Sequence, residues 1–172
     1  GDHRDLHFSL HDALPISHAG RGFRYQDAAG VWLAVRCWAH ELPYGAVIPE
    51  GKDDYELSSS MGSALVQVKS RRDHLGPFPA VVAAGFIRAL WARFENSASQ
   101  TNLILVLEHP VAEGPVVHYF LAEHPSLARA LQDDPPWTAL AALTQIWIVP
   151  APFEAAGTYA KPKPDCRHPA SN

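Results

Sequence analysis

The sequence predicts an α/β fold in which helices pack on a mixed β-sheet. Two apolar stretches, residues 25–42 and 78–94, have helical composition, and the one proline in them, Pro79, lies at the start of the second. Short segments of alternating polar and apolar residues lie between them, and the continuous apolar run 102–109 follows the second. Helices interleaved with strands in this order indicate a sheet with helices packed on it.

The size and charge of the chain limit its organisation and its partners. Of its 172 residues, 47% are hydrophobic and 19% are charged, so the chain can bury one sizeable core. We expect one globular domain over residues 20–150. The formal net charge of -4 and the pI of about 6.2 argue against a generally basic nucleic-acid binder. Any contact with DNA therefore has to come from a local basic patch.

Both ends of the chain lack the patterning of a packed domain. The segment Ser9–Ser17 has no helical or strand periodicity, and a common short-read sequencing adapter encodes it in this frame. We therefore expect residues 1–19 to be foreign to the natural protein, with a genuine disordered arm as the alternative. Residues 151–172 are rich in proline and polar residues, which favours a disordered tail, a linker, or a truncated or frame-shifted end.

The cysteines and the hydropathy pattern predict a soluble, cytoplasmic protein. Cys37 lies in an apolar helical stretch and Cys166 in the proline-rich end. Two cysteines in such positions do not indicate a disulfide framework. We expect both thiols to be free, as in a reducing compartment. No segment approaches the roughly 18 apolar residues that a membrane span needs, and the N-terminus lacks the order of a signal peptide.

The first half of the domain is expected to hold a helix and a three-strand meander. The helix, Tyr25–Leu42, is rich in Ala, Val, Leu and Trp and should be mostly buried. Residues 46–50 form a short strand, and residues 53–57 alternate acidic and apolar positions, as a half-buried strand does. Turn residues at 58–63 join this strand to the next, 64–70, as a hairpin.

The second half is expected to hold a helix, a buried strand and further short elements. Helix 78–94 has a proline close to its start, where proline is well tolerated. The run 102–109 contains β-branched residues, which is typical of a buried strand. Residues 124–132 indicate a short helix, and residues 137–149 a helix or a strand. The tryptophans are predicted to belong to the core rather than to stack on bases: Trp32, Trp38, Trp91, Trp137 and Trp147.

Polar residues recur at alternate positions of the predicted hairpin. Because side chains alternate across a strand, Gln67 and Lys69 share one face, and Asp54 and Glu56 share one face of the preceding strand. If the apolar faces of the two strands coincide, these four residues cluster on the other face. Carboxylate, amide and backbone carbonyl oxygens are hard ligands that Mg²⁺ prefers. A neighbouring ammonium group offsets charge on a phosphate under attack.

The segments DDYEL and VQVKS resemble the D…(E/Q)xK signature of the PD-(D/E)xK, restriction-endonuclease-like nucleases, in its D…QxK form. More narrowly, GFRYQDAAGVWLAV, PEGKDDYEL and LVQVKSRR resemble the double-stranded-DNA endonuclease domain that is the N-terminal effector of bacterial antiphage proteins, including CD-NTase-associated ones. The resemblance covers about Gly20 to Val149. It implies a core of helix, three-strand meander, helix and strand, and hydrolysis of double-stranded DNA with Mg²⁺ or Mn²⁺.

The resemblance also implies roles for individual residues. Asp54 is the metal-binding aspartate, with Asp53 as the alternative, and Lys69 is the catalytic lysine. Gln67 stands where many members carry glutamate and supplies a neutral oxygen ligand. Three further metal ligands are implied: the Val68 carbonyl, Gln26 and Glu50.

Basic residues follow the predicted site. Arg71 and Arg72 come directly after the strand, and Arg88 and Arg93 lie in the second helix. Beside an active face, such residues contact phosphates and give salt-sensitive binding that is independent of sequence. The ordinary alternatives are a solvated acidic edge strand, a solvent-facing basic strand end and a polar helix surface at Gln26.

Other site classes find no support in the sequence. No histidine or cysteine spacing fits a zinc site, and no GxGxxG, P-loop or GxSxG motif is present. Three hypotheses follow. The chain is a DNA endonuclease within a longer defence protein, with a fused or associated sensor or ATPase domain and with oligomers allowed. It is a degenerate nuclease fold that binds DNA or a partner protein. Or it is an inactive, truncated fragment.

Overall fold

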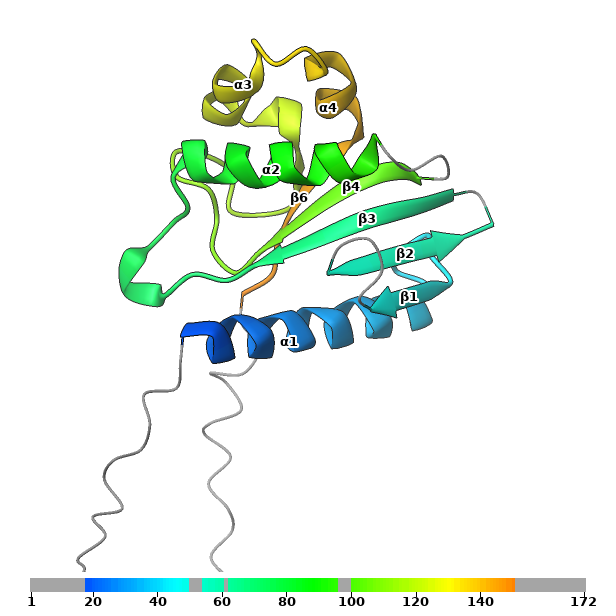
Figure 1. Ribbon diagram of the computed structural model, residues 1–172. Helices are drawn as coiled ribbons and strands as arrows, with labels where there is room; N and C mark the ends of the chain where they lie inside the picture. The colour runs from blue at the N-terminus through cyan, green and yellow to red at the C-terminus, as the bar shows by residue number, and fades with distance from the viewer. Residues whose placement is uncertain (1–17, 50–53, 61, 96–99, 151–172) are drawn as a thin grey trace, which may run out of the picture.

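The computed structural model describes residues 18–49, 54–60, 62–95 and 100–150, and it confirms the α/β class with a mixed sheet (Figure 1). In chain order the elements are α1 (His18–Trp38), β1 (Ala46–Pro49), β2 (Tyr55–Ser59), β3 (Gly62–Lys69), the 3₁₀ turn η1 (Asp73–Leu75), α2 (Ala80–Phe94), β4 (Gln100–Leu107), β5 (Tyr119–Phe120), the 3₁₀ turn η2 (Leu121–Glu123), α3 (Pro125–Leu131), α4 (Trp137–Leu143) and β6 (Thr144–Ile148).

The six strands form one sheet in the order β1-β2-β3-β4-β6-β5. The first three strands are an antiparallel meander, as predicted, whereas β3, β4 and β6 are parallel and β5 is antiparallel to β6. In the predicted hairpin, Tyr55 faces Val66 and Leu57 faces Ala64. Helix α1 covers one face of the sheet, and α2 lies on the other with α3 and α4 beyond it (Figure 1).

Each face of the sheet carries its own hydrophobic core. On the α1 side, Leu33 packs with Leu57, Val66 and Ile104, and on the α2 side Ile87 packs with Leu65, Leu103 and Ile146. Because both faces are covered, β3 is buried over six consecutive residues, 63–68. Parallel central strands are commonly buried on both faces in this way. A polar side chain in this strand therefore lies in a protein interior.

Helix α1 differs from the predicted range 25–42 at both ends. It begins at His18, and it ends at Trp38 in a Schellman motif. His40 has a left-handed φ of 57°, its N–H bonds the Cys37 carbonyl, and the Glu41 N–H bonds the Arg36 carbonyl. The sequence carries no glycine there, so the stop was not predictable from composition.

The other predicted elements are found with small changes of boundary. Helix α2, strand β4 and the short helix α3 lie within or close to their predicted ranges. The ambiguous range 137–149 holds a helix and then a strand, α4 and β6, rather than one of the two. Strand β5 was not predicted, because two residues are too short to show a period.

One prediction about the tryptophans is wrong. Trp147 is buried, and Trp32, Trp91 and Trp137 pack against the two cores, but Trp38 is 83% exposed at the last position of α1. Cys37 is buried and has a free thiol, as expected, whereas Cys166 lies outside the described residues. Among the described helices, none is both long and apolar enough to cross a membrane.

Candidate functional site

A cavity of about 270 Å³ lies at the C-terminal end of β3. Four of the predicted site residues line it: Gln26, Asp54, Val68 and Lys69. Gln26 comes from α1, Asp54 directly precedes β2, and Val68 and Lys69 end β3. The remaining wall consists of Gly22, Phe23 and Ser70. The predicted ligand Glu50 and the alternative aspartate Asp53 lie outside the described residues.

Asp54 is tied directly to the QxK segment. Its Oδ2 accepts a hydrogen bond from the Val68 backbone N–H, with an N···O distance of 2.7 Å. Tyr55, the next residue, faces Val66 in the β2–β3 register, so the aspartate adds one more link between the strands just before the start of β2. The bond holds the carboxylate beside Gln67 and Lys69. It also gives Asp54 a structural role at the strand end.

Gln67 lies in a different environment from the predicted one. The apolar faces of β2 and β3 do coincide, since Tyr55 and Leu57 pack in the same core as Val66. The opposite face is not a solvated polar face, because α2 covers it, and Gln67 is only 4% exposed there. Glu56 faces Leu65 and does not line the cavity, so it falls outside the predicted cluster.

The side-chain oxygen of Gln67 is an unusual feature of this interior. Among the described residues, Oε1 finds no hydrogen-bond donor. Leaving a buried acceptor unsatisfied costs about 1–3 kcal/mol, and such groups are uncommon in folded proteins. Leucine would fill this space without that cost. Gln67 does not line the cavity, so its predicted role as a metal ligand stays a prediction.

Lys69 emerges from the buried strand into the cavity. Its Nζ lies 5.5 Å from the centroid of the Phe86 ring on α2. The negative face of the ring attracts the ammonium group, which restricts the flexible lysine stem. The positive charge is thus held near Phe86 on α2, while Lys69 lines the same cavity as Asp54.

Two tyrosine hydroxyls fix α1 against the sheet. The Tyr25 hydroxyl donates to the Val149 carbonyl at 2.7 Å, and the Tyr55 hydroxyl donates to the Gln26 carbonyl at 2.9 Å. Burial, with a smaller effect of the Glu108 charge, raises the pKa of Tyr25, so its hydroxyl remains a donor. Tyr55 fits because residue 30 is glycine: a Cβ there would overlap its hydroxyl and ring. Gln26 is thereby positioned relative to Asp54.

The arginines predicted to contact phosphate divide into two groups. Arg71 and Arg72 line a second cavity of about 430 Å³, which shares Ser70 with the first. Arg88 instead bonds the Asp134 carboxylate at 2.9 Å and the Ala130 carbonyl at 2.8 Å, so it joins α2 to the α3–α4 region. Arg93 lies in the last turn of α2, at the end opposite to the site. Neither residue lines either cavity, and the suggested phosphate role of these two helix residues stays a prediction.

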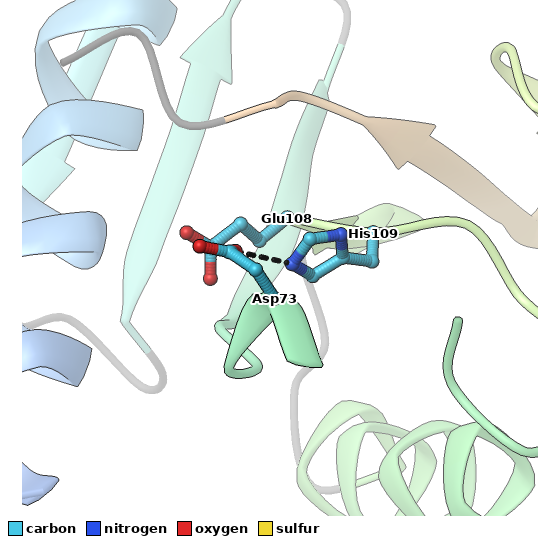
Figure 2. A group of neighbouring side chains, drawn as sticks. All are labelled: Asp73, Glu108 and His109. Atoms are coloured by element: carbon cyan, nitrogen blue, oxygen red, sulfur yellow. Dashed lines mark hydrogen bonds and ion pairs between the residues drawn. The ribbon is translucent and has the colours of Figure 1, made fainter. Parts of the chain in front are cut away.

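A group of three side chains beside the site was not predicted. Asp73, Glu108 and His109 have ligand atoms within 4.8 Å of one another, and Figure 2 shows the two carboxylates side by side with the imidazole approaching them. His109 Nε2 lies 3.1 Å from Asp73 Oδ1 and 3.2 Å from the Arg71 carbonyl, and Glu108 Oε2 accepts from the Arg71 N–H at 2.9 Å. These bonds hold the chain that follows β3.

The sequence contained a weak signal for this group. Glu108 and His109 directly follow an apolar strand, a place where polar residues commonly serve a site. Spacings of histidine and cysteine do not show this group, because its third member, Asp73, comes from a separate turn. The cluster is best explained as support for the Arg71 backbone, since its atoms already bond that segment.

The first cavity thus gathers a carboxylate, an amide, the end of a buried strand and an ammonium group. Such a set suits a hard divalent cation together with an anionic phosphate. Comparisons of the chain with protein-family models, with curated proteins and with solved structures found no match. The function must be inferred from the chemistry of the site.

Proposed function

We propose that this chain is a metal-dependent endonuclease that hydrolyses phosphodiester bonds of double-stranded DNA on a restriction-endonuclease-like core. The observation that carries the proposal is the convergence of Gln26, Asp54 and Lys69 on one cavity. These residues come from three separate segments of the chain. If the D…QxK pattern had arisen by chance, its Asp54 and Lys69 would have no reason to meet a helix glutamine in the same cavity.

The oxygen donors fit Mg²⁺ or Mn²⁺. Asp54 supplies a carboxylate, Gln26 an amide and Val68 a backbone carbonyl at the cavity wall. Gln67 Oε1 is a buried acceptor whose hydrogen-bonding capacity no described residue uses. Oxygen ligands of this kind suit a hard cation that keeps several waters. Glu50 stays a proposed further ligand.

The residues of the chain have distinct tasks in this reaction. A bound divalent ion supplies Lewis acidity toward the phosphate and lowers the pKa of a water. Asp54 would hold the ion at the end of β3, and Gln67, which does not itself line the cavity, is the proposed second ligand. Lys69 orients the water and offsets the charge that grows on the phosphate as the water oxygen attacks phosphorus and the bond to the leaving sugar oxygen breaks. Arg71 and Arg72 contact flanking phosphates.

The proposed biological setting is bacterial antiphage defence. The resemblance of the α1, β2 and β3 segments to effector nucleases supports it. A sensor or ATPase domain, fused or associated, would then control the activity, and self-association is compatible with such control. The free Cys37 thiol agrees with the reducing cytoplasm that we propose as its location.

A degenerate nuclease fold that only binds DNA is the second candidate. Two observations favour it: residue 67 is a neutral glutamine, and Asp54 already has a structural hydrogen bond. Incubation of supercoiled plasmid with Mg²⁺, with Mn²⁺ and with a chelator separates the two. The endonuclease converts plasmid to nicked and linear forms in either metal and not with chelator. The binding module retards DNA in all three conditions, in a salt-dependent manner, and cuts it in none.

A further inference from the structure

The cavity next to the proposed catalytic one has a mixed basic and apolar lining. We name it the base pocket, and its lining residues are Ser70, Arg71, Arg72, Leu75, Phe78, Val82 and Phe86. Its volume of about 430 Å³ lies within the roughly 300–1,000 Å³ typical of small-molecule sites. Leu75 is 51% exposed and Val82 is 38% exposed, so apolar surface is open to solvent beside two cations.

We infer that the base pocket takes one unpaired nucleotide of the DNA strand whose neighbouring phosphate lies at Lys69. The base lies against the apolar wall, and its phosphate lies at the arginines. This inference rests on the proposed function, because it assumes that DNA occupies the first cavity.

The lining distinguishes a nucleotide from a bare phosphate backbone. A duplex backbone presents charged and hydrated groups, which bind to cations. It would not cover Leu75 and Val82, whose apolar side chains would stay exposed to water. An unpaired base presents a flat apolar face and remains attached to a phosphate, so it satisfies both parts of the lining. Single-stranded nucleic acid is commonly bound in this way, by aromatic and cationic surfaces together.

The side chains of the pocket are already held in place for such a ligand. The Arg71 guanidinium bonds the Leu75 carbonyl at 3.3 and 3.4 Å and lies 5.5 Å from the centroid of the Phe78 ring. It is therefore kept against the wall instead of extending into solvent, and a planar guanidinium is a stacking surface for bases.

The two cavities are adjacent on the same strand end. Ser70 lines both of them, and Lys69 lines the first while its Nζ contacts the Phe86 ring that lines the second. A nucleotide in the base pocket is thus a direct neighbour of the phosphate at Lys69. The expected consequence is a preference for DNA with unpaired nucleotides, such as tailed or frayed duplexes, over fully paired DNA.

The experiment measures DNA binding in chelator, so that no cleavage occurs. Two duplexes are compared, one blunt and one with a short single-stranded tail that carries 2-aminopurine. The protein is expected to bind the tailed duplex about tenfold more tightly, the effect of one stacked base, and to change the 2-aminopurine emission. Val82→Trp fills the pocket with an indole and is expected to remove both the preference for the tailed duplex and the change in 2-aminopurine emission.

Val81→Trp is the matched control. Val81 is 71% exposed in the same turn of α2 and does not line the pocket, so this variant should behave like the natural chain. Equal affinity of the natural chain for both duplexes, or a tail preference that survives in Val82→Trp, would overturn the inference. Plasmid cleavage is measured separately. Cleavage without a tail preference would contradict only the role of the base pocket. A tail preference without cleavage would contradict only the proposed endonuclease activity.

Discussion

The Asp54 carboxylate and the Val68 backbone N–H are joined by a hydrogen bond of 2.7 Å. This bond connects the start of β2 to the end of β3, where the two halves of the proposed site meet. Removing the side chain at residue 54 would therefore disturb the strand end and the site together. Asparagine keeps an acceptor oxygen but loses the charge, so it separates the two roles of the residue.

Gly30 is predicted to be required for the packing of α1. In Gly30→Ala the new Cβ overlaps the Tyr55 ring, and we expect a loss of about 1–3 kcal/mol in the free energy of unfolding. Gly85→Ala in α2 is the control, because a Cβ there meets no atom and alanine favours a helix by about 0.5–1 kcal/mol. Urea denaturation of both variants measures the difference. Equal stabilities would show that Tyr55 does not fix α1.

Gln67 is predicted to be retained for a ligand and not for stability. Gln67→Leu removes the unpaired acceptor, so without metal its free energy of unfolding should equal or exceed that of the natural chain by up to about 1–3 kcal/mol. The rise in melting temperature that Mg²⁺ causes in the natural chain should disappear in this variant.

Gln67→Glu gives the complementary result. Without metal it buries a carboxylate and lowers the melting temperature, and Mg²⁺ should then raise it by more than in the natural chain. If Gln67→Leu lowers stability and leaves the response to Mg²⁺ intact, Gln67 is a packing residue and not a metal ligand.

Arg72 is predicted to neutralise a DNA phosphate. Arg72→Gln should lower DNA affinity and reduce the slope of log affinity against log salt concentration by about 1. Arg129→Gln, on the exposed side of α3, provides a charge-matched control that should leave the slope unchanged. Fluorescence anisotropy at several salt concentrations measures the slopes. The same slope in both variants would contradict a phosphate contact at Arg72.

His118 is predicted to make stability depend on pH. Its Nδ1 accepts from the Ile148 N–H at 3.0 Å, which requires the unprotonated nitrogen. Partial burial beside Trp32 and Trp147, with a smaller effect of the Arg36 charge, lowers the pKa of His118 below its ordinary value of 6.5. Between these pKa values the unfolded chain binds more protons than the folded one, so stability rises with pH there.

The corresponding test compares the natural chain with His118→Phe. The contribution of His118 is present above a pH of about 6.5 and is lost as the pH falls toward the folded pKa. Urea midpoints at about pH 7.5 and about pH 5 should therefore differ more in the natural chain than in the variant. An identical change in both would show that another group causes the pH dependence.

Local pattern predicted those features that depend on neighbouring residues in the chain. The alternation in 53–57 and 64–70 placed Tyr55 and Val66 in one core, and the register between β2 and β3 agrees. The same alternation assigned Asp54 and Lys69 to one face, and both line one cavity; Gln26 and Val68, which also line it, were implied by the resemblance and not by the alternation.

Features that arise from distant segments were not predictable. Because α2 covers the second face of β3, Gln67 is buried instead of solvated. The support of Arg71 by Glu108 and His109 joins segments far apart in the sequence, and the pairing of Arg88 with Asp134 joins two helices. No period or spacing in the sequence encodes such contacts.

The most direct test of the proposed activity is Mg²⁺-dependent cleavage of supercoiled plasmid by four proteins. The site variants are Asp54→Asn and Lys69→Met, which keep the size of each side chain, and Asp133→Asn is an exposed control beyond α3. We predict that the natural chain and Asp133→Asn cleave at the same rate, and that each site variant is slower by a factor of about 100 or more. Equal cleavage by all four proteins would contradict the assignment of the site.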